Sequence, residues 1–162
     1  MVVGRGLGVQ KLLSKFLNIY NDRKRLVLCL NASQNEQSLL SAILDEGCPP
    51  HMLPVIINNE TLTKDRLALY KRGGVFIVTS RILIVDLLNS VVKPSDIDGL
   101  LVHNAHRVRD ESTEAFIIRI YRRHNQVGFL KAFSEDPETL TRGFSKLSSI
   151  LRALHLKKVY LW

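Results

Sequence analysis

The sequence predicts an α/β fold, in which helices cover both faces of a mostly parallel sheet. Apolar runs suited to buried strands alternate with segments whose apolar residues recur at the helical period, as in βαβ units. The run 75–79 is the most strand-like of these, and the glycine-rich segment 4–8 stands where a short apolar strand would pass into a helix. With 162 residues and no internal repeat or linker, the chain is expected to form one domain.

The first elements follow from the spacing of apolar residues. Residues 1–3 are expected to form a truncated strand. The helix predicted over 9–20 places five apolar or aromatic side chains on one face: Leu12, Leu13, Phe16, Leu17 and Tyr20. The charged segment 21–25 is expected to be a solvated turn, and the uninterrupted apolar run 26–30 predicts a second strand.

Capping signals delimit the next elements. The segment 33–46 opens with the capping-box pattern Ser-x-x-Glu, which predicts a helix that ends before Gly47. A short strand over 53–57 then leads to a helix over 64–72, for which Gly73 is the C-terminal stop.

The second half of the chain continues the alternation. After the strand at 75–79, Ser80 is expected to cap a helix. The later elements are, in chain order, a strand over 100–102, a helix over 112–124, a strand over 128–132, a helix over 137–154 that begins at Pro137, and a last strand or exit from the domain over 159–162.

Composition and charge limit the classes of function. The formal net charge of +8 fits a polyanionic partner. The most apolar stretch, 75–92, is interrupted by Arg81 and Asp86, so neither a transmembrane helix nor a membrane partner is expected. Cys29 and Cys48 are too few for a disulfide framework and favour a reducing compartment.

The glycine-rich turn has the outline of a phosphate-binding loop without its charged side chain. In the loop of an NTPase, lysine and then serine or threonine follow the last glycine; the lysine neutralises phosphates and the hydroxyl binds Mg²⁺. Here Gly4, Gly6 and Gly8 are followed by Val9 and Gln10. The helix N-terminus can still hold an anion weakly through its free N–H groups. The simpler alternative is a tight strand-to-helix connection.

A second motif follows the apolar run 100–102. The segment His103-Asn104-Ala105-His106-Arg107 is similar to the Asp-Glu-Ala-His box of superfamily 2 helicases, with His103 at the metal-binding aspartate and Asn104 at the glutamate that acts on water. Mg²⁺ prefers carboxylate oxygens, which neither residue supplies. His103 and His106 lack a third ligand at a matching offset, so no zinc site is expected. We expect no catalytic residue, metal or cofactor anywhere in residues 1–162, and expect His106 and Arg107 to bond to neighbouring loops.

Two groups of residues are candidates for phosphate contacts. Thr79, Ser80 and Arg81 stand between a strand and a helix, where a hydroxyl and backbone amides can bind phosphate; the alternative is a plain serine cap. Arg107 and Arg109 follow the carboxyl end of a predicted strand, the edge at which open α/β sheets bind ligands. The remaining basic clusters are interpreted as solvated faces, several of them at helix C-termini: 23–25, 71–72, 119–124 and 157–158.

In their order and spacing, these motifs resemble the XPF-type structure-specific DNA repair endonucleases, whose N-terminal half is a degenerate helicase. The resemblance covers nearly the whole chain and includes the segments 5–8, 73–83, 105–107, 114–117, 128–129, 131–133 and 160–162. It implies a RecA-like fold of the P-loop NTPase type. It also implies that residues 1–162 are the first helicase-like lobe of a longer protein, with the nuclease and helix-hairpin-helix regions absent here.

The resemblance implies a function as well. The lobe would bind DNA or act as a scaffold without hydrolysing ATP, for an endonuclease acting at duplex/single-strand junctions in nucleotide excision repair, crosslink repair and recombination. It implies a nuclear location, repair scaffold partners and a heterodimer with a small ERCC-type subunit through regions absent here. Mg²⁺ would serve only the absent nuclease site. Two alternatives remain open: a protein-interaction platform that hardly touches DNA, and a residual NTPase or translocase.

Overall fold

A five-stranded sheet forms the centre of the computed structural model, which describes residues 1–4, 6–32, 36–45, 47–49, 53–141 and 144–160. The strand order is β2-β3-β1-β4-β5, and each neighbouring pair is parallel. The strands are β1 (Leu26–Leu30), β2 (Val55–Ile57), β3 (Gly74–Val78), β4 (Gly99–Val102) and β5 (Phe129–Ala132). The prediction of a parallel α/β sheet is confirmed.

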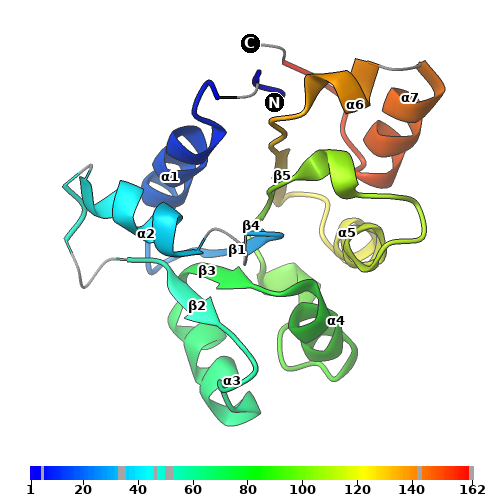
Figure 1. Cartoon of the computed structure of the whole chain (residues 1–162). Coiled ribbons are helices and arrows are strands. Elements are labelled where there is room, and N and C mark those ends of the chain that lie inside the picture. The colour runs from blue at the N-terminus through cyan, green and yellow to red at the C-terminus, as the bar shows by residue number, and fades with distance from the viewer. Residues whose placement is uncertain (5, 33–35, 46, 50–52, 142–143, 161–162) are drawn as a thin grey trace.

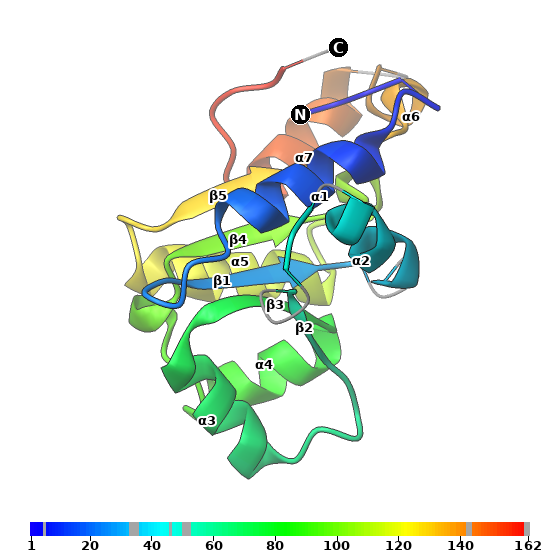
Figure 2. The same cartoon turned by 90° about the vertical axis from the view of Figure 1, so that its left-hand side faces the viewer.

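Helices cover both faces of this sheet, as the sequence predicts (Figures 1 and 2). The helices are α1 (Val9–Ile19), α2 (Glu36–Asp45), α3 (Thr63–Arg72), α4 (Ser80–Leu88), α5 (Thr113–His124), α6 (Pro137–Thr141) and α7 (Phe144–Ala153). Helices α1 and α2 pack on one face, whereas α3, α4, α5 and α7 contribute to the core on the other. Two short 3-10 helices, η2 (Pro94–Asp96) and η3 (Ala105–Arg107), flank β4.

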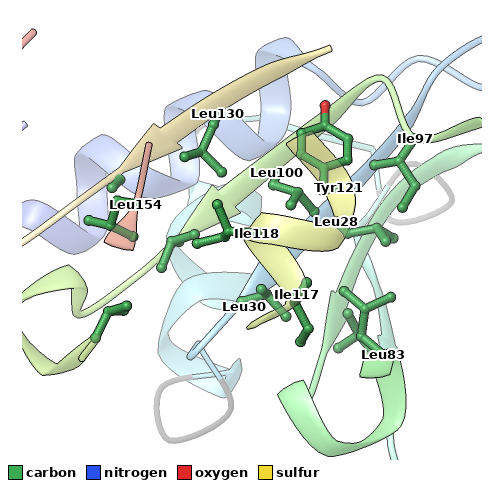
Figure 3. Close-up of a cluster of buried hydrophobic side chains, with 14 of the residues drawn as sticks. Leu28, Leu30, Leu83, Ile97, Leu100, Ile117, Ile118, Tyr121, Leu130 and Leu154 are labelled. Carbon is green, nitrogen blue, oxygen red and sulfur yellow. The ribbon is translucent and has the colours of Figure 1, made fainter. Parts of the chain in front are cut away.

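The central strands are buried on both faces because their side chains alternate between two hydrophobic cores. In β1, Leu28 and Leu30 belong to the core beneath α4, α5 and α7, while Val27 and Cys29 belong to the core beneath α1 and α2. Figure 3 shows the first core, with side chains of β1, β4 and β5 facing those of α5. Cys29 and Cys48 are both buried and neither is in a disulfide within the described residues, and burial raises the pKa of the Cys29 thiol to about 12.

Most element bounds agree with the predicted ones within two residues, but the C-terminal helix does not. In place of the single helix expected over 137–154, the structure has α6 and α7, on either side of residues 142–143, which are outside the described part of the chain. Among the described residues, none of the helices is long and apolar enough to span a bilayer.

The two chain ends also differ from expectation. Residues 1–3 make one isolated parallel bridge, between Val2 and Ser134, instead of a strand. Residues 159–160 are not in a strand, and 161–162 lie outside the described residues. The predicted capping box before α2 also falls on residues that are not described, 33–35.

An ion pair between the fully buried Asp86 and the partly exposed Arg66 joins α3 to α4. The carboxylate of Asp86 is fully buried and accepts hydrogen bonds from Arg66 Nε and Arg66 Nη2, each at 2.8 Å, and from the Tyr70 hydroxyl at 2.9 Å. Arg66 Nη1 also donates to the backbone oxygen of Thr61 at 2.6 Å. Because the carboxylate is shared by two donors from α3, the pair fixes the position of α4.

Candidate functional site

The carboxyl ends of the strands lie at one edge of the sheet, because all strand pairs are parallel. Just beyond β5, Ser134 bonds to the N-terminal segment through Ser134 N–H to Met1 O (3.1 Å) and Val3 N–H to Ser134 O (2.9 Å). The glycine turn that follows Val3 therefore starts at this edge. The fold thus brings the two nucleotide-site motifs, which are far apart in the sequence, to the same edge of the sheet.

The glycine turn adopts a backbone conformation that favours glycine at two positions. Gly6 and Gly8 have φ angles of 80° and 81°, and Leu7 N–H donates to Gly4 O at 3.1 Å. Gly8 is the N-cap of α1 and has no side chain to accept from the first N–H groups of that helix, which therefore stay available to an anion. The next side chain, Val9, is only 2% exposed and packs in the core beneath α1 and α2. The lysine position of the loop is therefore filled by a core residue.

His103, at the end of β4, is buried without a polar partner. Its backbone N–H donates to Leu30 O at 2.9 Å, but its side chain is 1% exposed and neither ring nitrogen has a hydrogen-bond partner among the described residues. Burial lowers the pKa of His103 below its ordinary value, which outweighs the opposite effect of Glu135. The ring is therefore neutral at physiological pH. Leu101, two residues earlier, packs on the α1 side of the sheet, so strand alternation turns His103 toward α1.

Asn104 is fixed by its backbone conformation and by a neighbouring strand end. It adopts the left-handed conformation, with φ 51° and ψ 45°, which asparagine tolerates better than most residues. Its side-chain amide donates to the backbone oxygen of Asn31, which follows β1, at 3.4 Å. Asn104 therefore has a structural contact at the place where a helicase carries its glutamate.

His106 links the ends of β4 and β5, which confirms that it bonds to a neighbouring loop. Its Nδ1 lies 2.9 Å from the hydroxyl oxygen of Ser134, and Ala105 N–H donates to Phe133 O at 2.9 Å. Among the described residues, no group of three or more metal-ligating side chains is placed to hold an ion.

The residues present do not fit Mg²⁺-ATP. The orphaned imidazole of His103 offers a buried nitrogen where Mg²⁺ prefers carboxylate oxygen, and Val9 offers a buried methyl group where the phosphates need a cation. Among the described residues at this edge, only the backbone N–H groups at the start of α1 still resemble the phosphate site of an NTPase.

The end of β3 carries the first group of predicted phosphate contacts, with one difference. Thr79, not Ser80, is the N-cap of α4: its hydroxyl accepts from Ile82 N–H at 3.4 Å, and the helix begins at Ser80. The Ser80 hydroxyl donates instead to Glu114 Oε1, at 2.7 Å. Thr79 is the better cap because its backbone is extended, as a cap residue requires.

Glu114 is a residue of this edge that the sequence did not reveal. It lies in the first turn of α5, where an acidic residue also complements the helix dipole. Its contact with Ser80 joins residues that are 34 positions apart. Only the packing of α5 beside α4 brings them together, because nothing in the local sequence of either helix links the two residues. Arg81, beside Ser80, is exposed.

Arg107 and Arg109, the second group, are exposed beyond the end of β4. They line an open depression of about 400 Å³ together with Asp110, Glu111 and Ser112. The carboxylates of Asp110 and Glu111 thus stand beside the two guanidinium groups. They make this depression less positive than the two arginines alone would make it. Both groups of predicted residues lie at the carboxyl edge of the sheet, one beyond the end of β3 and the other beyond the end of β4.

Comparison with known proteins gives relatives over the whole chain. No family model matches. The chain is 34% identical over 169 residues to the DNA repair endonuclease XPF of Dictyostelium discoideum, and 37% identical over 163 residues to that of Mus musculus. It is 36% identical over 190 residues to the DNA repair protein RAD1 of Saccharomyces cerevisiae. All of the chain is matched in each case, but it spans only 18%, 18% and 17% of these relatives.

Solved structures of helicases share the fold. The helicase domain of Pyrococcus furiosus Hef superimposes with a TM-score of 0.77 at 20% identity, covering 99% of this chain and 34% of that one. A hypothetical ATP-dependent RNA helicase from Sulfolobus tokodaii gives a TM-score of 0.64 at 15% identity, covering 99% and 47%. The chain therefore has the RecA-like fold of a helicase lobe.

Proposed function

Because the chain belongs to the XPF type of DNA repair endonucleases, as a helicase-like lobe, we propose that it contacts DNA without hydrolysing ATP. The observation that carries this proposal is the neutral imidazole of His103, which has no hydrogen-bond partner in the described part of the chain and is buried where a helicase holds its metal-binding carboxylate. Hydrolysis requires a metal ion and a positioned water, and Val9 also removes the cation that would neutralise the phosphates. The backbone of the phosphate site is retained without its charges.

Support for the DNA contact comes from the same edge of the sheet. Thr79, Ser80 and Arg81 form the N-terminus of α4, where backbone N–H groups and the helix dipole favour a phosphate. Arg107 and Arg109 add exposed guanidinium groups beyond β4. A single phosphate backbone running across the ends of β3 and β4 would meet both groups.

A role in a longer protein is also proposed, and the names of the relatives support its substrate class. The parent is proposed to be an endonuclease that cuts branched or splayed DNA at duplex/single-strand junctions, in nucleotide excision repair, crosslink repair and recombination within the nucleus. Its Mg²⁺-dependent nuclease site and the region that pairs with a small ERCC-type subunit would lie outside residues 1–162. The relatives named as DNA repair endonucleases support the substrate class.

A second candidate function is a platform that docks repair scaffold proteins and hardly touches DNA. Two contacts favour it: the Ser80 hydroxyl is already held by Glu114, and Asp110 and Glu111 stand beside the arginines of the β4 end. Both contacts place negative charge where a phosphate would approach. The residual NTPase is the weakest candidate, and ATP turnover that disappears on changing Gly8 or His103 would be needed to support it.

Fluorescence anisotropy across a salt series separates the two main candidates. The chain is titrated onto splayed-arm DNA, with linear duplex as competitor. The DNA-contact proposal expects a preference for the splayed DNA and an affinity that falls steeply with salt. In Arg107→Ala or Arg109→Ala the salt slope is expected to become shallower by about 0.9 for each phosphate left without its cation. Weak binding to both DNAs, unchanged in these variants, would favour the docking platform. Arg152→Ala, on the exposed surface of α7, is the matched control.

A further inference from the structure

Three basic segments that are separate in the sequence meet at the opposite edge of the sheet. They are the loop before β1, the junction of α3 and β3, and the loop before β4, each at the amino end of a strand. Their exposed side chains are Arg23, Lys24, Arg25, Lys71, Arg72 and Lys93. Figure 2 shows the first two segments at the left-hand side, away from the arrowheads of the strands. We refer to these six side chains as the amino-edge basic surface.

The meeting of these segments is enforced by close backbone packing. Gly74 N–H donates to Arg25 O at 2.7 Å, and Asp98 N–H donates to Leu26 O at 2.8 Å. A Cβ atom at Gly73 would collide with the backbone oxygen of Arg23. Only glycine therefore lets these two segments of the chain approach this closely. The basic side chains are therefore neighbours because of the fold, and no local pattern in any one segment predicts it.

The surface is hollowed and carries an excess of positive charge. Two depressions, of about 560 and 620 Å³, share Arg23 and Gly73 in their walls. Three acids also line them, Asp22, Asp96 and Asp98. Each accepts a hydrogen bond within the fold: from Lys24 N–H at 2.9 Å, from Ser95 Oγ at 3.0 Å and from Leu26 N–H at 2.7 Å, respectively. The cations outnumber the acids two to one.

The cations are not used by the fold. Within the described part of the chain, none of the six makes a side-chain hydrogen bond or ion pair, in contrast to Arg66 with Asp86. Lys71 and Arg72 complement the dipole at the end of α3, which accounts for those two residues but not for the convergence of three segments. Like charges gathered without partners cost free energy, which a polyanionic ligand would remove.

We propose that the amino-edge basic surface binds the phosphate backbone of duplex DNA, as a second contact separate from the carboxyl edge. The aromatic residues that line the depressions, Tyr70 and Phe76, are buried, so no ring is presented for stacking on unpaired bases. Recognition by charge alone, without base contacts, suits a duplex backbone and is independent of sequence.

The two contacts cannot bind the same phosphates. Strand β1 has five residues, which corresponds to a separation of about 17 Å between the edges of the sheet before loops are counted. DNA held at the carboxyl edge would therefore meet the amino edge only through another part of the duplex or another arm. Binding at the amino edge is therefore independent of binding at the carboxyl edge.

The test compares two triple variants of the 162-residue chain that remove the same charge. Arg23→Gln/Arg25→Gln/Lys71→Gln removes half of the amino-edge basic surface. Arg119→Gln/Arg123→Gln/Lys146→Gln removes three exposed cations from α5 and α7 and is the control. The readout is the dissociation constant for a linear duplex by fluorescence anisotropy across a salt series, after circular dichroism has confirmed equal folding.

The amino-edge variant is expected to bind tenfold or more weakly at low salt. Its salt slope is expected to fall by about 2 to 3, since each phosphate that is no longer neutralised accounts for about 0.9. The control is expected to keep the slope of the original chain. Equal weakening in both variants, or no duplex binding by the original chain, would overturn the proposal. Displacement of the duplex by poly-glutamate at equal charge concentration would also overturn it, in favour of an acidic protein partner. The Arg107→Ala and Arg109→Ala variants report on the carboxyl edge alone, so failure at one edge is distinguishable from failure at the other.

Discussion

Replacing His103 with leucine is expected to make the stability of the chain less sensitive to acid. The imidazole is 1% exposed, and its ring nitrogens have no partner among the described residues. Burial is the main cause that lowers its pKa, so in mild acid the unfolded chain binds a proton that the folded chain does not. The unfolded state therefore gains stability as the pH falls through the ordinary pKa of histidine, and the folded protein is destabilised.

The magnitude follows from the linkage between protons and folding. For an unfolded-state pKa of about 6.5 and a folded ring that stays neutral, a change from pH 7 to pH 5 lowers the free energy of unfolding by at most about 1.9 kcal/mol. In a chain of this size, that corresponds to a fall of about 4–8 °C in Tm. Leucine has a similar volume and leaves no unsatisfied polar atom, so His103→Leu is expected to be at least as stable as the original chain at pH 7.

The assay is urea unfolding followed by circular dichroism at both pH values. The fall in stability between pH 7 and pH 5 is measured for the original chain, for His103→Leu and for His155→Leu, an exposed histidine of the same chain. The contributions of the other titrating groups to the change in stability are the same in all three proteins, so they cancel when the changes are compared. If the free energy of unfolding falls equally in His103→Leu and the original chain, or if His103→Leu is less stable at pH 7, the reasoning about the buried ring is refuted.

Three further outcomes are expected. Asp86→Ala should lower the free energy of unfolding by about 3–5 kcal/mol in urea titrations, because Arg66 keeps a charge without its partner. The double variant Asp86→Leu/Arg66→Met should recover most of this stability, and a failure to recover it would contradict the pairing. Val9→Lys with Gln10→Thr should show no ATP turnover above background in a phosphate-release assay, since the acids of the second motif are missing as well; turnover would show that the second motif is competent. Gly73→Ala should lower Tm by several degrees in a thermal melt, because the position has φ 74° and its Cβ would meet a backbone oxygen; an unchanged Tm would mean that the turn can relax.

The sheet was predictable because its strands carry strong local signals. The run 26–30 is apolar at every position since both faces of β1 are buried, and its predicted and observed bounds coincide. Gly73 marked the end of α3 correctly, because its positive φ of 74° favours glycine there. The motif 103–107 predicted that His106 bonds to a neighbouring loop, but its partner, Ser134, is 28 positions away and was not predicted.

Contacts between distant segments were not predictable. The acceptor of the Ser80 hydroxyl, Glu114, lies on a different helix, so the sequence favoured Ser80 as the helix cap and missed the better placed Thr79. The basic segments at 23–25 and 71–72 looked like solvated faces because each is explained locally. Only the parallel packing of β1 beside β3 shows that they share one edge.

The central claim, DNA contact without ATP hydrolysis, is tested most directly by one titration of splayed-arm DNA with the chain, by fluorescence anisotropy, in the presence and absence of Mg²⁺-ATP and with linear duplex as competitor. The account predicts that splayed DNA is preferred over duplex and that the dissociation constant is the same with and without nucleotide, because Val9 and the neutral His103 leave no site for Mg²⁺-ATP. A dissociation constant that changes with Mg²⁺-ATP, or equal binding of the two DNAs, would contradict it.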